Sequence, residues 1–156
     1  MKKFVANLVR FPLLRQLMLL GIRLFVPRQR LGVTMVALDE RNRVLLLRHV
    51  FHPEYPWGLP GGWLGRNEPP DQGVLRELRE ETGLTAVLGP TLLVRREDHP
   101  PHIGIAYLGY VQPGAFSLSG EIIEAAWFDP DDLPPLYPFM ADAIQIALKR
   151  QQKSEA

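Results

Sequence analysis

Residues 58–84 constrain the fold of this 156-residue chain more than any other segment. Four of the thirteen glycines fall within residues 58–65, and glycine at this density marks tight backbone geometry. A helical pattern follows at 70–82, with a proline where the first turn tolerates one and Gly83 where a C-terminal cap belongs. We therefore expect a glycine-rich loop that leads directly into an α-helix.

The expected helix carries three glutamates, Glu77, Glu80 and Glu81, at spacings of three and four residues. At about 100° per residue, all three side chains project from one side of the helix. Such a carboxylate cluster beside a glycine-rich loop suits a hard divalent cation, because Mg²⁺ prefers oxygen ligands and leaves positions for water and substrate phosphates. The alternative is a solvated helix face held together by ion pairs with Arg76 and Arg79.

A longer spacing favours the metal site over the solvated face. Gly62 is followed after five residues by Glu68, and after seven more by the run Arg76-Glu77-Leu78-x-Glu80-Glu81-x-Gly83-Leu84. This spacing is a complete match to the Nudix box, and the sequence therefore resembles the Nudix hydrolases over residues 31–150. The resemblance implies an α/β fold, the Nudix α/β/α sandwich with a mixed β-sheet.

The resemblance also implies a reaction and a cofactor. Nudix hydrolases cleave a diphosphate linkage in a nucleoside diphosphate joined to another group, using Mg²⁺ or Mn²⁺. Carried onto this box, the expected metal ligands are the carbonyl of Gly61 and the carboxylates of Glu77, Glu80 and Glu81. Four further positions are expected to be structural: Gly62, Glu68, Arg76 and Gly83.

The group that takes a proton from the attacking water varies among Nudix hydrolases. Glu77 is one candidate here, since a carboxylate can accept a proton from water whose pKa a metal has lowered. Glu121 is another candidate for both metal binding and catalysis, because the family often places such a glutamate in a loop before a late aromatic strand. Glu124 is a third.

Substrate-binding residues are less constrained by the sequence. Arg48 ends an expected strand near where the family often carries a phosphate-contacting residue, with Arg95 and Arg96 as alternatives to it. A solvated arginine is an equally open interpretation of each. Three aromatic residues before the box suit either base stacking or loop anchoring: Phe51, Tyr55 and Trp57. Four histidines are expected to be loop residues rather than metal ligands: His49, His52, His99 and His102.

Hydrophobic patterning predicts a mixed sheet around the box. The expected strands lie at 31–39, 43–50, 85–95, 103–112 and 121–128. The first two read as a hairpin around the polar turn 40–42, and the uncharged run 103–111 suits a central strand. A further helix is expected at 138–151.

Charge divides the chain into a basic arm, residues 1–30, and an acidic body, residues 31–156. The arm holds seven Lys and Arg residues and no Asp or Glu, whereas the body holds eleven against all 17 carboxylates, a net charge of −6. We expect a helical extension followed by a hydrolase domain. The overall charge of +1 gives no reason to expect a stable nucleic-acid complex, and the lack of cysteine excludes thiolate metal sites.

The arm reads as one or two amphipathic helices with a break at Pro12. Arg10 and Arg15 interrupt its apolar region, which argues against both a signal peptide and a membrane span and for a cytoplasmic protein. Four leucines at helical spacing would cover the body or a second subunit in a homodimer: Leu13, Leu17, Leu20 and Leu24. The alternative is contact with a membrane surface, with the arginines facing lipid phosphates.

Two classes of function follow. The first is a Mg²⁺-dependent pyrophosphohydrolase acting on a nucleotide-type small molecule such as a nucleotide sugar, ADP-ribose, a CDP-alcohol or a nucleoside triphosphate. The second is a non-catalytic Nudix-fold nucleotide sensor or interaction module. The intact glutamate set argues for the enzyme, since a module without catalysis has no need of three clustered carboxylates.

Overall fold

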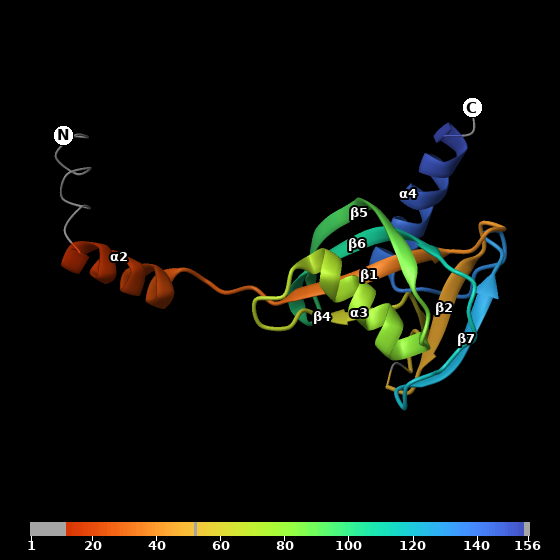
Figure 1. Ribbon diagram of the computed structural model, residues 1–156, viewed down its shortest axis with the longest axis horizontal. Coiled ribbons are helices and arrows are strands. Elements are labelled where there is room, and N and C mark those ends of the chain that lie inside the picture. Colours follow the sequence, from red (N-terminus) through yellow and green to blue (C-terminus); the bar gives the residue numbers. More distant parts are fainter. Residues whose placement is uncertain (1–11, 52, 155–156) are drawn as a thin grey trace.

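The computed structural model describes residues 12–51 and 53–154, shown as a ribbon in Figure 1. Its strands are β1 (Leu31–Leu38), β2 (Val44–His49), β3 (Trp57–Gly58), β4 (Gly61–Trp63), β5 (Ala86–Asp98), β6 (Pro101–Val111) and β7 (Ile122–Phe128). Its helices, within this described part, are α2 (Pro12–Phe25), α3 (Pro70–Thr82) and α4 (Pro138–Ser154). The helix expected at 70–82 and the one expected from 138 are both confirmed.

The strands form one mixed sheet in the order β3-β2-β1-β6-β5, with β4 paired to β1 and β7 paired to β2. β1 and β6 run parallel from the pair Leu31 and Ile103 to the pair Leu38 and Tyr110. The other pairings are antiparallel. β6 therefore lies between β1 and β5, which confirms the central strand expected from its uncharged run.

Side chains of successive residues in β1 and β2 point to opposite faces of the sheet, and a helix covers each face. On the α3 side the buried core holds Val33, Met35, Ala37, Leu45, Leu47, Val74, Leu78, Leu84 and Ile122. On the α4 side it holds Val36, Leu38, Val44, Leu46, Leu59, Leu92, Ala106, Leu108, Phe139, Ala143, Ile144 and Ala147. This arrangement confirms the α/β/α sandwich with a mixed sheet.

The hairpin expected around the turn 40–42 is confirmed, because β1 and β2 pair antiparallel at Leu38 and Val44. Two other local expectations are corrected by the sheet. β3 and β4 lie in the segment expected to be a loop, because short strands rich in glycine show no alternation of their own. His102 lies in β6 and His49 ends β2, whereas His99 is in the turn after β5 and His52 lies outside the described residues.

α2 projects from the body at the end of an exposed linker, residues 26–30 (Figure 1). It buries none of its residues. The part of the arm before Pro12, and with it the break expected there, lies outside the described residues. The four leucines expected to cover the body or a second subunit are between 51% and 71% exposed, so they do not cover the body. Both faces of the sheet already carry a helix, α3 or α4, which leaves the body no uncovered core face for α2. Within the described residues, no helix has the length and apolarity needed to cross a membrane.

Candidate active site

The rotation of α3 is set by its buried face. Val74 and Leu78 are fully buried against the sheet, and each such side chain contributes about 2 kcal/mol of burial free energy. The helix ends at Gly83, whose φ of 74° is left-handed and whose N–H donates to the carbonyl of Arg79 at 2.8 Å. A Cβ at this position would also lie 2.9 Å from Ser117 Cβ. The helix is therefore fixed in both rotation and length, with its glutamates toward β4.

Two glycines of β4 lie against those glutamates. The N–H of Gly61 donates to Glu81 Oε2 at 2.9 Å. A Cβ on Gly62 would lie 2.6 Å from the Cδ and Oε1 atoms of Glu77, so the carboxylate of Glu77 packs directly on the glycine backbone. Antiparallel pairing of Gly61 with Thr34 of β1 holds this strand in place. Glycine at position 62 thus allows the carboxylate of Glu77 to approach the main chain, whereas glycine at position 61 allows β4 to lie close to β1.

Arg76 joins the loop after β4 to α3. Its Nε donates to Glu68 Oε1 at 2.7 Å and its Nη2 to Glu68 Oε2 at 2.9 Å, a bidentate pair. The same guanidinium contacts Glu77 at 2.9 Å and Glu80 at 2.8 Å. Glu68 also accepts the N–H of Gly65 at 2.7 Å. The pKa of Glu68 is lowered to about 2, mainly by the hydrogen bonds from Arg76.

Replacing Glu68 by Gln is expected to lower the melting temperature by about 3 °C at neutral pH, because the bidentate pair is lost. Glu68 has a depressed pKa, so its stabilisation is present above the ordinary value of 4.5 and is lost as the pH falls toward about 2. The difference between the two proteins should therefore close over that range in thermal melts. Glu40→Gln, at an exposed turn, is the control. A difference that persists at pH 2 would contradict this account.

The carboxylates nearest β4 have raised pKa values. The pKa of Glu81 is raised to about 8, mainly by burial. The charges of Glu77, Glu121 and Glu80 raise it further, whereas the hydrogen bond from Gly61 lowers it. Burial likewise raises the pKa of Glu77. The loop before β7 thus brings the charge of Glu121 within electrostatic reach of Glu81, although the two are far apart in sequence.

Glu124, the third candidate, is placed differently from Glu121. It lies on β7, where it is paired in the sheet with Arg48 of β2, and its Oε2 accepts from Arg48 Nη1 at 3.3 Å. Both side chains are about half exposed, at 51% for Glu124 and 44% for Arg48. The structure therefore groups Glu121, and not Glu124, with the glutamates of α3.

The oxygen donors along α3 and β4 match the preferences of a hard divalent cation. Within residues 12–51 and 53–154, no three Asp, Glu or His side chains already stand in positions that would hold a metal, and Arg76 pairs with Glu77 and Glu80. The raised pKa of Glu81 nevertheless supports a cation at this position. The buried carboxylate of Glu81 lies near other carboxylates, and a cation would offset their repulsion. The donor set therefore suits the metal that the Nudix resemblance implies.

A cavity of about 550 Å³ opens beside the glutamates and is lined by both Gly61 and Gly62. Its volume falls in the range of small-molecule sites, and five of its lining residues are Phe, Tyr or Trp. The aromatic lining comes from Tyr55, Trp57, Trp63, Tyr137 and Phe139. Trp63 and His102 meet edge to face with their ring centroids 5.0 Å apart. A planar ligand group and a charged group would thus have adjoining places, one in the cavity and one at the glutamates.

The substrate-binding residues expected from the sequence are only partly brought together here. Trp57 lines the cavity and also packs edge to face on Phe128 at 5.0 Å. Among the described residues, no arginine lines it. Arg95 instead pairs with Glu97 at 2.7 Å and with Asp142 at 2.6 Å.

Sequence reasoning missed several cavity residues. Glu97 is 7% exposed, and its Oε2 accepts from the hydroxyl of Tyr137 at 2.8 Å. Tyr137 directly precedes α4, Phe139 lies in its first turn and His102 comes from β6, so no local pattern joins them. Trp63 lies inside the box itself, and its place in the box was the one signal that pointed to it.

Comparisons with known proteins identify relatives of this chain. The YjhB protein of Bacillus subtilis is 34% identical over 119 residues, which are 72% of this chain and 56% of that protein. The ADP-ribose pyrophosphatase of Methanocaldococcus jannaschii is 30% identical over 104 residues, 64% of this chain and 62% of that protein. The matched part of the chain thus spans less than two thirds of each relative's length.

The fold is also similar to that of solved Nudix structures. The MutT Nudix hydrolase of Burkholderia pseudomallei has a TM-score of 0.67 and 28% identity, covering 76% of this chain and 98% of that one. A family model described as the NUDIX domain matches residues 28–147, which include the whole sheet, α3 and the cavity. With the box, the sandwich and this match in agreement, the chain belongs to the Nudix family.

Proposed function

We propose that this protein is a divalent-metal-dependent pyrophosphohydrolase that cleaves a diphosphate linkage in a nucleotide-type small molecule. The observation that carries the proposal is the contact of Glu77 and Glu81 with β4 at the edge of the aromatic cavity. These glutamates would hold a metal and a diphosphate, and the adjoining cavity would hold a planar ring. A protein that only binds nucleotides would need the cavity but not the glutamates.

The residues that would hold the metal are the carbonyl of Gly61 and the carboxylates of Glu77, Glu80 and Glu81. A bound Mg²⁺ or Mn²⁺ supplies a Lewis acid for the diphosphate oxygens and water of lowered pKa. Glu121 and Glu77 are the two carboxylates suited to take a proton from the attacking water. Arg76, through Glu68, keeps the loop after β4 fixed against α3.

The cavity favours a substrate that contains a nucleobase. Its aromatic walls suit stacking on a planar ring, and the glycines that line it adjoin the carboxylates where a diphosphate would lie. The relative from Methanocaldococcus jannaschii is named for hydrolysis of ADP-ribose. We therefore place ADP-ribose and related nucleoside diphosphate derivatives first among the candidate substrates, ahead of nucleoside triphosphates.

A hydrolysis panel tests the proposal. The purified chain is incubated with ADP-ribose, nucleotide sugars, CDP-alcohols and nucleoside triphosphates, with Mg²⁺, with Mn²⁺ or with a chelator, and monophosphate release is measured. We expect turnover that requires the metal and falls about 100-fold or more in Glu80→Gln. Glu124→Gln, which removes a carboxylate bound to Arg48, should retain the wild-type rate. Ligand binding without hydrolysis of any panel member would favour the sensor instead.

A further inference from the structure

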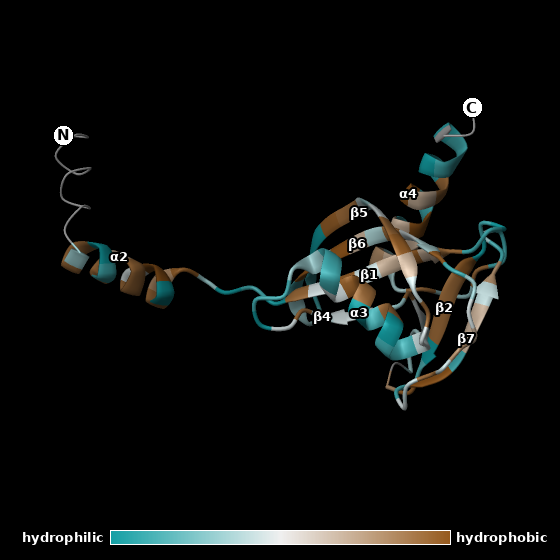
Figure 2. Ribbon diagram, viewed as in Figure 1, coloured by the Kyte–Doolittle hydropathy of each residue, from teal (hydrophilic) through white to brown (hydrophobic). Residues whose placement is uncertain are grey.

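α2 carries the largest group of exposed apolar side chains in the described chain. None of its residues is buried, and large hydrophobic residues along its length are 48% to 84% exposed. In Figure 2, hydrophobic residues alternate with hydrophilic bands along α2, and the linker that follows is hydrophilic. An apolar helix surface of this extent requires a partner, since exposed apolar patches mark interaction sites.

The side chains of α2 are sorted by chemistry around its axis. At about 100° per residue, Arg15, Gln16 and Arg23 fall within one sector about 100° wide. The opposite arc, about 200° wide, holds leucine, isoleucine, methionine and phenylalanine together with Gly21. Leu19 is an exception, because it lies within the arginine sector. An apolar arc this wide exceeds the stripe of about 100° that a helix usually packs against a globular core.

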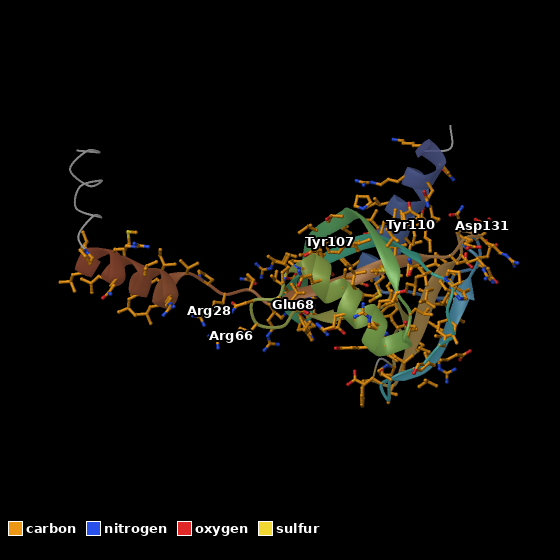
Figure 3. All side chains as sticks on the ribbon, viewed as in Figure 1. Arg28, Arg66, Glu68, Tyr107, Tyr110 and Asp131 are labelled. Carbon is orange, nitrogen blue, oxygen red and sulfur yellow. The ribbon has the colours of Figure 1, made fainter. Side chains whose placement is uncertain are left out.

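The charge of this region has one sign. α2 and its linker carry Arg15, Arg23, Arg28 and Arg30 and no carboxylate, and none of the four forms an ion pair with another described residue. Figure 3 places Arg28 and Arg66 where the arm meets the body. The linker and the loop after β4 line one cavity there, with Arg30 on the linker side and Glu68 on the loop side. A complementary partner is therefore anionic as well as apolar.

An anionic phospholipid surface has both properties. Lipid phosphates pair with arginine, and the acyl boundary accepts the apolar arc of a helix that lies in the interface. α2 has 14 residues and is about 21 Å long, whereas a membrane-spanning helix needs about 20 residues. A second copy of α2 fits less well, because a helix pair buries a stripe of about 100° and would leave about half of the apolar arc exposed.

We propose that α2 binds the surface of an anionic phospholipid bilayer. Its leucine, methionine and phenylalanine side chains enter the acyl boundary, and Arg15 and Arg23 face the lipid phosphates. The body, with its net charge of −6, stays outside the bilayer at the end of the linker. The basic arm thereby gives the hydrolase a location at a membrane surface without contributing to the glutamate site.

Vesicle flotation with the full chain tests this proposal. The full chain is mixed with phosphatidylcholine vesicles that contain or lack phosphatidylglycerol, and we expect it to float with the anionic vesicles and to lose binding as salt rises. Leu17→Ser, on the apolar arc, should reduce partitioning about tenfold. Leu19→Ser, in the arginine sector, is the matched control and should bind as the wild type does. Arg23→Glu should reduce binding to anionic vesicles several-fold.

Three results would overturn the proposal. The first is equal flotation with both kinds of vesicle, and the second is equal loss of binding in Leu17→Ser and Leu19→Ser. The third is a dimer, measured by light scattering after size exclusion, that Leu17→Ser converts to a monomer while no vesicle binding is found; this would assign the apolar arc to a second copy. Retained hydrolysis in both leucine variants shows that the body is folded.

Discussion

Glu81→Gln is expected to reduce turnover about 1,000-fold and, at the same time, to stabilise the metal-free protein. Turnover falls because a neutral amide replaces a carboxylate proposed to bind the metal. The metal-free folded state gains stability because the substitution removes a carboxylate that is largely buried near other carboxylates. This burial raises the pKa of Glu81 to about 8. The amide oxygen of Gln can still accept the N–H of Gly61, so the contact with β4 is kept.

The stabilisation has a predicted pH dependence. Because the pKa of Glu81 is higher in the folded state than its ordinary value of 4.5, the folded state binds the proton more tightly. Stability of the metal-free wild type therefore falls as the pH rises from about 4.5 to about 8. Glu81→Gln does not have this loss, and at neutral pH it should be more stable by on the order of 2 kcal/mol.

Denaturant unfolding in the presence of a chelator, at pH values from 4 to 8, measures this difference. The two proteins should converge at the acidic end, and added Mg²⁺ should reverse their order at neutral pH because it binds the folded wild type. Glu80→Gln, at a side chain that is 60% exposed, should lose activity with little change in stability. A Glu81→Gln protein that is less stable than wild type at neutral pH without metal would contradict the burial argument.

Gly61→Ala is expected to have the largest effect on the fold itself. Gly61 has a φ of 156°, which disfavours any residue with a Cβ, and an added Cβ would collide with the carbonyl oxygen of Val33 and lie 2.7 Å from Thr34 Cα. These are backbone atoms of β1, which cannot move aside without disturbing the central sheet. We expect a loss of about 3 kcal/mol or more and a melting temperature lower by about 10 °C.

The same substitution should impair turnover, since it displaces the N–H that Glu81 accepts and the carbonyl proposed to bind metal. Gly120→Ala is the matched control, because no atom lies within 4 Å of a Cβ built there. Thermal melts and the hydrolysis assay measure the two effects on both variants. Similar melting temperatures for Gly61→Ala and Gly120→Ala would show that β1 shifts to accommodate the added methyl group, and would contradict this prediction.

Local patterns predicted the elements that depend on neighbouring residues. The first-turn proline and Gly83 delimit α3 at both ends, as their positions in the sequence predict. Prediction failed where pairing partners are distant. β4 was expected to be loop, since its conformation depends on pairing with β1 some thirty residues earlier. His102 was misplaced for the same reason, because it belongs to a strand defined by its neighbours β1 and β5.

The sequence by itself determined the identity and spacing of the chemical groups. Glu77, Glu80 and Glu81 project from one side of α3 because helical geometry depends only on residues within a few positions of one another. It also determined the division into a basic arm and an acidic body, since charge is a property of composition.

The tertiary structure alone decided which groups meet. It brings Glu121 within electrostatic reach of Glu81 and builds the aromatic cavity from several strands and the start of α4. It also leaves the apolar arc of α2 uncovered, because α3 and α4 already occupy both faces of the sheet. The physical reason is the same in each case: these contacts depend on strand pairing and burial between residues far apart in sequence, which local periodicity does not encode.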